Sequence, residues 1–245
     1  MTRLDGRVAL VTGSSSGIGA AIAGALSAEG AHVVVNSRSS VAAGEEVARD
    51  VGGTYLQADV SDPDGARDLV ARVVAESGRL DILVNNAGTT RLIPHSDLEA
   101  ATAEVWAELY ATNVIAPFVL TTAAAPHLRE APGGGSVVNI GSLAGVRPVG
   151  SSIPYAASKA ALHHQTRLLA KVLGPGVRVN AVAPGLVDTP WTADWSELRA
   201  GVEAVSPMRR SGRPEDVAHL VLAQVTSSYL TGQVWVIDGG MSLVV

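Results

Sequence analysis

Seven short runs of apolar, mostly β-branched residues alternate with longer alanine-rich segments, and this alternation constrains the fold of the chain most. The apolar runs are nearly continuous, which is typical of strands buried on both faces of a parallel sheet. Segments between such strands form helices on both faces. We therefore predict one α/β domain, residues 1–245, with a doubly wound parallel seven-stranded sheet. The expected strands are 7–13, 32–37, 54–60, 81–88, 136–142, 177–184 and 234–240, and the expected helices are 17–30, 41–51, 63–77, 100–128, 154–173 and 214–226.

The composition supports a well-packed domain and argues against several functional classes. Hydrophobic residues make up 47% of the chain and charged residues 17%, which is enough to fill a core. A net charge of −5 without a basic run argues against nucleic acid as a partner. The absence of cysteine excludes disulfides and zinc–thiolate sites. With no signal-peptide pattern and no apolar stretch near the roughly 20 residues of a membrane helix, we expect a soluble, cytoplasmic protein and no membrane partner.

Glycines at 13, 17 and 19 follow the first expected strand and open the first expected helix. A backbone without Cβ atoms can approach a pyrophosphate closely, and the helix N-terminus directs N–H groups at it. This strand, turn and helix form the context that a Rossmann-type dinucleotide site requires. The pattern predicts that a dinucleotide is held by Gly13, Ser15, Ser16, Gly17, Ile18 and Gly19.

The end of the second strand indicates which dinucleotide. NAD-binding proteins usually place an acid there for the ribose 2′-hydroxyl, whereas this chain has Asn36, Ser37 and Arg38. An arginine can form charge-assisted bonds with a 2′-phosphate that a carboxylate would repel. We therefore expect NADP(H), although Arg38 could also be an ordinary solvated loop residue.

Two further strands end in polar or small residues. Ligands of open α/β sheets bind at the carboxyl ends of strands. Asp59 is placed to accept a hydrogen bond from the adenine amino group, with Val60 beside the ring. The sequence "NNAG" at 85–88 adds Asn86, Ala87 and Gly88 to the expected cofactor site.

The sequence "YAASK" puts Tyr155 and Lys159 four residues apart. In a helix these side chains share one face, so a phenol and an ammonium could serve one site. The alternative is a packed tyrosine beside a solvated lysine. A phenol, with an unperturbed pKa of about 10, becomes a useful acid only if its pKa is lowered. A neighbouring ammonium would lower it.

Taken together, the motifs resemble those of the short-chain dehydrogenase/reductase family, including members that act as 3-oxoacyl-(acyl-carrier-protein) reductases. The resemblance runs almost end to end. It rests on "TGSSSGIG" at 12–19, "ADV" at 58–60, "NNAG" at 85–88, Asn113 in "TNV", Ser142 in "NIGS", "YAASK" at 155–159, "RVNAVAPG" at 178–185 and "TGQVWVIDGG" at 231–240.

The resemblance implies a hydride-transfer enzyme with Asn113, Ser142, Tyr155 and Lys159 as its catalytic set. Tyr155 is expected to act as acid or base, and Ser142 to hold the substrate oxygen. Lys159 is expected to bind the nicotinamide ribose. Asn113 is expected to hold a proton-relaying water through its side chain or a local break in the helix. Further cofactor contacts are implied for Pro184, Gly185, Val187 and Thr189, the last against the nicotinamide carboxamide.

Residues from about 188 to 212 are expected to form a flap over the substrate, as in the family. Trp191 and Trp195 are four residues apart and could wall an apolar pocket or merely anchor the flap. Together with them, the expected substrate contacts are Ser142, Leu143, Val149 and Ile153, with His95 a further candidate. No arginine or lysine is an obvious carboxylate clamp, which favours a neutral, apolar ketone or secondary alcohol.

Three alternatives and two expectations remain. The protein could be a 3-oxoacyl-(acyl-carrier-protein) reductase, although Arg129 has no basic neighbours for an acidic carrier. It could be a non-catalytic NADP(H)-sensing regulator, or a relative with altered chemistry.

We expect no metal site, because His163 and His164 are adjacent and point about 100° apart on a helix. The apolar end "VWVIDGGMSLVV" and the family resemblance favour a homo-oligomer, a tetramer.

Overall fold

The computed structural model describes residues 3–245 and contains the predicted parallel sheet. Its seven strands follow the order β3-β2-β1-β4-β5-β6-β7, and every neighbouring pair is parallel. This confirms the expected Rossmann-type, single-domain fold. The strands are β1 Val8–Val11, β2 His32–Ser37, β3 Thr54–Gln57, β4 Ile82–Asn85, β5 Gly135–Ile140, β6 Val177–Pro184 and β7 Val234–Ile237.

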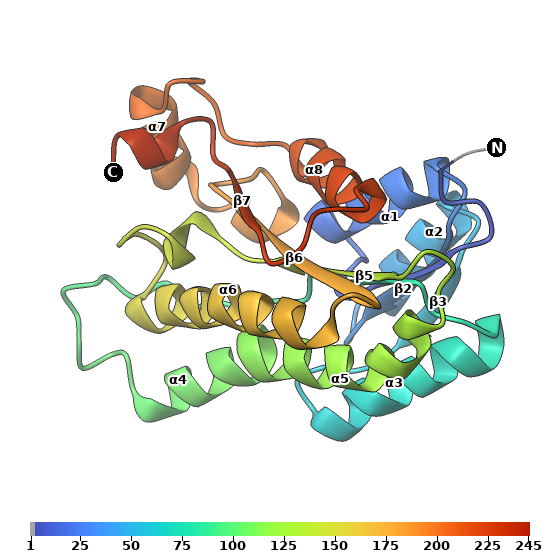
Figure 1. Ribbon diagram of the computed structural model, residues 1–245. Helices are drawn as coiled ribbons and strands as arrows, with labels where there is room; N and C mark the ends of the chain where they lie inside the picture. Colours follow the sequence, from blue (N-terminus) through green and yellow to red (C-terminus); the bar gives the residue numbers. More distant parts are fainter. Residues whose placement is uncertain (1–2) are drawn as a thin grey trace.

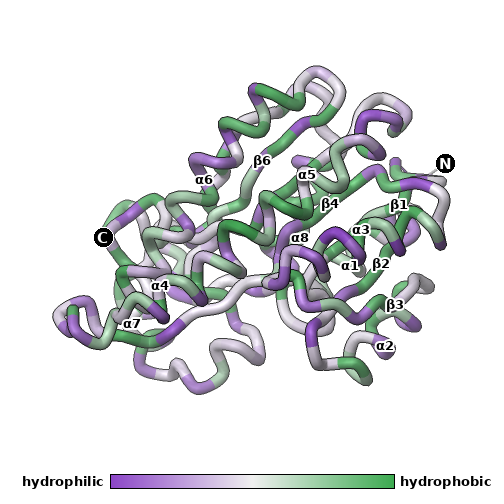
Figure 2. Tube along the Cα trace, turned by 90° about the horizontal axis from the view of Figure 1, so that it is seen from below, coloured by the Kyte–Doolittle hydropathy of each residue, from purple (hydrophilic) through white to green (hydrophobic). Residues whose placement is uncertain are grey.

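Helices cover both faces of the sheet and enclose two apolar cores (Figure 1). One core joins the sheet to α3, α5 and α6, with Leu69, Leu120 and Leu169 among its residues. The other joins it to α1, α2 and α8, with Ile22 and Val221. The central strands β1 and β4 are buried along their whole length, as expected for parallel strands covered on both faces. Figure 2 shows hydrophobic residues along parts of both strands and helices. The helices are α1 Gly17–Ala28, α2 Val41–Asp50, α3 Pro63–Ser77, α4 Ala103–Tyr110, α5 Ala116–Arg129, α6 Ile153–Leu173, α7 Ser196–Val205 and α8 Pro214–Thr226.

The order of the strands reverses between β1 and β4, because the chain builds outward from β1 in one direction and then restarts at β4 in the other. Crossover helices on opposite faces separate at such a point, which leaves a crevice beyond the carboxyl ends of the strands. Local signals position the connections. Asp62 caps α3 by accepting hydrogen bonds from Asp64 N and Gly65 N, and left-handed Gly78 ends that helix.

Two elements differ from the sequence expectations. The expected helix at 100–128 is α4 and α5 joined by a π-helical turn at Ala111–Ile115. This run, Ala103–Arg129, is long and apolar enough to span a membrane by length and composition, which the sequence reading missed. Its buried residues Leu109, Leu120 and Leu128 pack into the domain, so we interpret it as a core helix. The segment at 188–212 contains the unexpected helix α7 beside the C-terminal residues (Figure 1).

Candidate active site

A cavity of about 890 Å³ lies beyond the carboxyl ends of the strands. Each expected cofactor residue lines it, from the glycine turn through the ends of β2, β3 and β4 to Thr189 after β6. Ser142, Tyr155 and Lys159 line the same cavity. The structure therefore brings together residues that are up to 176 positions apart, from Gly13 to Thr189, and one ligand could contact both groups.

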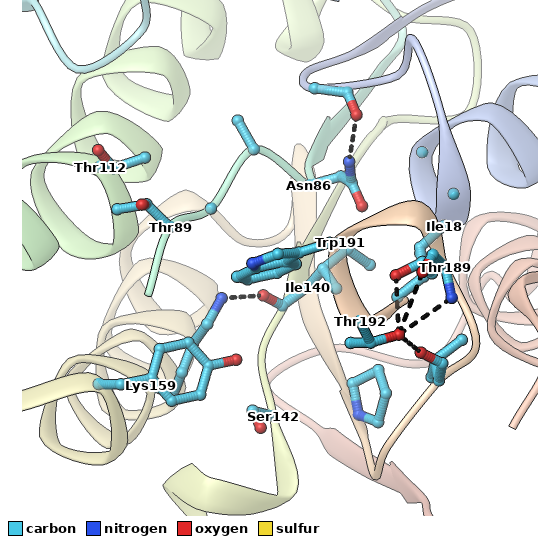
Figure 3. A pocket seen from close by; sticks show the side chains of 18 of the residues that line it. Ile18, Asn86, Thr89, Thr112, Ile140, Ser142, Lys159, Thr189, Trp191 and Thr192 are labelled. Carbon is cyan, nitrogen blue, oxygen red and sulfur yellow. Dashed lines mark hydrogen bonds between the residues drawn. The ribbon is translucent and has the colours of Figure 1, made fainter. Parts of the chain in front are cut away.

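The glycine turn is built for close approach. Gly13 has a φ of +62°, and a Cβ there would lie 2.9 Å from the Cα of Ala87. A Cβ on Gly19 would lie 2.5 Å from the side-chain nitrogen of Asn86, which donates hydrogen bonds of 2.9 Å to both Thr12 O and Gly13 O. These contacts fix the loop after β1 against the loop after β4 (Figure 3).

The first turn of α1 fits the diphosphate of a dinucleotide. Its N-cap residue Ser16 makes no capping hydrogen bond through its side chain, and Ser16, Gly17 and Ile18 line the cavity. A helix N-terminus without a side-chain cap offers N–H groups and the positive end of the helix dipole to an anion. The free N–H groups at the start of α1 are thus the donors that the diphosphate of a dinucleotide requires.

The far end of the cavity contains the residues expected to choose the dinucleotide. The Arg38 side chain is 72% exposed, with its guanidinium 4.0 Å from the carboxylate of Asp59. Ser37 hydrogen-bonds to the Tyr55 hydroxyl at 2.8 Å. The Asn36 amide donates to the carbonyl oxygens of residues 56 and 58, so its side chain supports the turn, and only Arg38 extends free into solvent among these three.

Tyr155 and Lys159 project from the first turns of α6, whose N-cap Ser152 accepts a hydrogen bond from Tyr155 N. Lys159 is 4% exposed, and its Nζ donates a 2.9 Å hydrogen bond to Ile140 O. Nζ lies 5.7 Å from the centre of the Tyr155 ring. Figure 3 shows the Lys159 amine and the Ser142 side chain at the same side of the cavity. Tyr155 and Lys159 thus lie one turn apart on α6 and line one cavity.

The charges at this site differ from expectation in one respect. Burial raises the pKa of the Tyr155 phenol, and a hydrogen bond with Ser142 partly opposes this. Burial also lowers the pKa of Lys159 to about 8. The predicted lowering of the Tyr155 pKa by Lys159 is absent, because the Lys159 ammonium is turned toward Ile140 O and both groups are desolvated.

Asn113 lies within the π-helical turn and does not line the cavity. Its amide nitrogen donates to Thr89 O and Ser158 Oγ, each at 3.0 Å, and its oxygen accepts from Thr89 N at 2.9 Å. The side chain is therefore committed to tying the loop after β4 to α6, which leaves the expected water-holding role to the local break in the helix.

Most of the expected substrate residues line the cavity, two of them from the segment 188–212. Trp191 and Trp195 line the cavity with ring centres 6.5 Å apart, but they do not share a helix, because Trp195 is the N-cap of α7. Leu143 and Val149 line the same cavity. Ile153 and His95 do not reach the cavity, since Ile153 begins α6 with its side chain directed outward, at 38% exposure.

Sequence reasoning missed several residues around the site. Thr192 accepts from Thr189 N and donates to Val187 O, which fixes the loop after β6 (Figure 3). The "TxxT" spacing within 189–192 could have indicated this turn. The cavity is also lined by Thr89, Glu108, Thr112, Ser151, Leu198, Val202, Met241 and Val245. These residues lie on segments far apart in the sequence, and no local pattern shows that the segments fold together.

The two adjacent histidines have different surroundings. His164 is exposed, whereas His163 is 3% exposed and packs one helical turn beyond Lys159. Burial, followed by the charge of Lys159, lowers its pKa to about 4. Within residues 3–245, no group of three or more metal-ligating His, Asp or Glu side chains gathers.

Comparison with known proteins agrees with this geometry. A family model described as Enoyl-(Acyl carrier protein) reductase matches residues 13–242. The granaticin polyketide synthase protein of Streptomyces violaceoruber assigned as ketoacyl reductase 2 is 56% identical, over 96% of each chain. The 3-oxoacyl-(acyl-carrier-protein) reductase FabG of Thermotoga maritima is 39% identical, over 98% of this chain and 99% of the relative.

A further relative and a solved structure are similar over nearly the whole chain. The 7alpha-hydroxysteroid dehydrogenase of Clostridium sardiniense is 37% identical, over 99% of this chain and 96% of the relative. A solved mutant of the Serratia marcescens short-chain dehydrogenase/reductase superposes with a TM-score of 0.89 at 38% identity, covering 98% of this chain and 99% of that one. The chain is an oxidoreductase that belongs to the short-chain dehydrogenase/reductase family.

Proposed function

We propose that this protein is an NADP(H)-dependent ketoreductase that interconverts a neutral, apolar ketone and a secondary alcohol. One observation carries the proposal: Ser142, Tyr155 and Lys159 open into the same cavity as the uncapped turn of α1. A carbonyl beside Tyr155 would therefore lie next to whatever dinucleotide the glycine turn holds.

The chain's own residues would supply the acid and the oxygen site. The dinucleotide, when bound, supplies the hydride. Ser142 Oγ would donate a hydrogen bond to the carbonyl oxygen, and Tyr155 would deliver the proton as negative charge develops there. The buried Lys159 ammonium would stabilise the phenolate that remains once Nζ turns from Ile140 O toward the phenol. Bonds of Asn113 to Thr89 and Ser158 would hold the loop and α6 in register.

The choice of NADP(H) is supported by Arg38. Its exposed guanidinium can rotate toward a 2′-phosphate, and a charge-assisted bond is about twice as strong as a neutral one. The only carboxylate nearby among the residues lining the cavity is Asp59, already 4.0 Å from Arg38.

The choice of substrate is supported by the apolar lining near Tyr155. Trp191, Trp195, Leu143, Val149 and Leu198 surround the space beside the catalytic residues. A second candidate is a carrier-linked 3-oxoacyl group, favoured by the names of the Streptomyces and Thermotoga relatives. We further propose that the protein acts in the cytoplasm as a homo-oligomer.

Replacing Tyr155 by Phe tests the proposal. A panel of neutral ketones, a 3-oxoacyl thioester and secondary alcohols would be assayed with NADPH and NADH, following cofactor absorbance. We expect Tyr155→Phe to lower kcat at least about 10²-fold with unchanged dinucleotide affinity, because general acid catalysis contributes about 10²–10⁴-fold. Binding of dinucleotide without turnover of any substrate by the unchanged protein would instead favour a non-catalytic sensor.

A further inference from the structure

The substrate end of the cavity contains an ion pair that the proposed reaction does not use. Arg91 follows β4, and its Nη2 lies 2.6 and 2.8 Å from the two carboxylate oxygens of Glu108 on α4. Both residues line the cavity. Their side chains are 52% and 42% exposed, so a bound substrate could reach either charge.

Arg91 is the cation that an anionic substrate would meet there. Among the described residues that line the cavity, the other cations are Arg38 and Lys159. Arg38 follows β2 and lies beside Asp59 at the opposite end. Lys159 is 4% exposed and donates to Ile140 O. A carboxylate placed near the reacting carbonyl could therefore pair readily only with Arg91.

The ion pair is held in place by its surroundings. Thr90 Oγ1 and Ser151 Oγ are 2.5 Å apart, and Ile93 N donates to Ser151 O at 2.8 Å. These bonds fasten the segment that carries Arg91 to the segment that precedes α6. Glu108 projects from the last turn of α4. Because both backbones are anchored, forming the pair orders only the two side chains.

We propose that Glu108 is a specificity-determining residue that keeps the cavity selective for neutral ketones. This inference rests on the proposed ketone reduction. A substrate carboxylate would have to displace Glu108 from Arg91 and then lie beside a second negative charge. A substrate carboxylate that replaces Glu108 at the Arg91 guanidinium gains no net attraction, because one ion pair is exchanged for another. The substrate carboxylate and the displaced Glu108 carboxylate then repel each other. A neutral ketone meets neither cost.

A matched pair of substrates tests this role. Ethyl 3-oxo esters and the free 3-oxo acids of the same chain lengths would be reduced at pH 7 with saturating cofactor. Glu108→Gln should raise the acid-to-ester ratio of kcat/KM at least about tenfold, because it frees the Arg91 guanidinium for a charge-assisted bond. Changing Arg91 to Gln in the same chain should remove that gain. Saturated carboxylates should bind the Glu108→Gln enzyme about tenfold more tightly in calorimetric titrations.

Glu104→Gln is the matched control, because Glu104 lies one turn earlier on α4 and does not line the cavity. It removes the same charge and should leave the ratio within about twofold. An unchanged ratio in Glu108→Gln would overturn the inference. A selective loss of acid reduction in the single variant Arg91→Gln would overturn it too, because Arg91 would then already bind substrate carboxylates in the unchanged enzyme. If the unchanged enzyme reduces no ester, the proposed function fails, and the titrations still decide the role of Glu108.

Discussion

Arg38 is the single residue on which the proposed choice of dinucleotide depends, since Ser37 and Asn36 are engaged by Tyr55 and by backbone carbonyls. Arg38→Ala should lower kcat/KM for NADPH by about 10- to 100-fold, the loss expected for hydrogen bonds to a charged group. The value for NADH should change less than about threefold. Arg67→Ala, which removes an exposed arginine of α3, is the control. Equal losses for both dinucleotides would contradict the assignment.

The pKa of Lys159 gives a testable pH dependence. Burial lowers this pKa to about 8, so the ammonium form dominates below pH 8 and is lost above it. Because kcat/KM for the dinucleotide reports the free enzyme, we expect it to fall about tenfold per pH unit above about pH 8. In Lys159→Arg the side chain stays charged. The fall of kcat/KM above pH 8 should therefore vanish in this variant, although its activity is lower. A wild-type profile that is flat to pH 10 would refute the prediction.

At the scale of elements, the boundaries of the strands show what sequence can and cannot predict. The strands expected at 32–37 and 177–184 match β2 and β6, whereas five others were drawn too long at their carboxyl ends. Most of the residues wrongly included there line the cavity, such as Gly13, Asp59, Asn86 and Ser142. These residues are polar or small, and the chain leaves the sheet there to form the site.

The site was predictable where a short stretch of sequence determines how its own residues are arranged. The spacing of Tyr155 and Lys159 on α6 and the glycine turn before α1 are local, and both predictions name residues that line the cavity. Helix α7, the Arg91–Glu108 pair and the burial of His163 were not found. Each depends on which distant segments meet, and the short-range pattern of a single sequence does not record this.

The junction of β5 and α6 should be sensitive to volume. A Cβ added to Gly141 would lie 2.0 Å from Nε2 of His163, which is 3% exposed and has little room to move. Gly141→Ala should therefore lower the free energy of unfolding by about 1–3 kcal/mol through overpacking. Activity should fall too, because Ser142 and Lys159 sit on either side of this contact.

A double-mutant cycle measured by urea unfolding separates this clash from a backbone effect. In a His163→Ala background the added methyl group has space, so Gly141→Ala should cost at least about 1 kcal/mol less there than alone. Additive changes would show that the two side chains do not collide.

At the scale of the whole molecule, two apolar surfaces within residues 3–245 are candidates for subunit contacts. One lies on α5, the π-helical turn before it and α6, where Ile115, Phe118, Leu168 and Val172 are 46–67% exposed. The other lies at the C-terminal end of the described chain, where residues 243–245 are 43–81% exposed. Contiguous exposed apolar patches mark interaction sites. A tetramer with dihedral symmetry uses at least two separate self-complementary interfaces, which matches two such surfaces.

Breaking one surface should therefore leave dimers. For the unchanged protein we expect light scattering to give about 100 kDa, four chains of 25.0 kDa. Phe118→Glu combined with Val172→Glu places charges on helix positions that are 47% and 67% exposed, so the fold should persist while the mass falls to about 50 kDa. Lys171→Glu, one position before Val172 on α6, introduces a similar charge at a site that is already polar, and this control should leave the larger mass unchanged. A mass of 25 kDa for the unchanged protein would show instead that both apolar surfaces are free in solution.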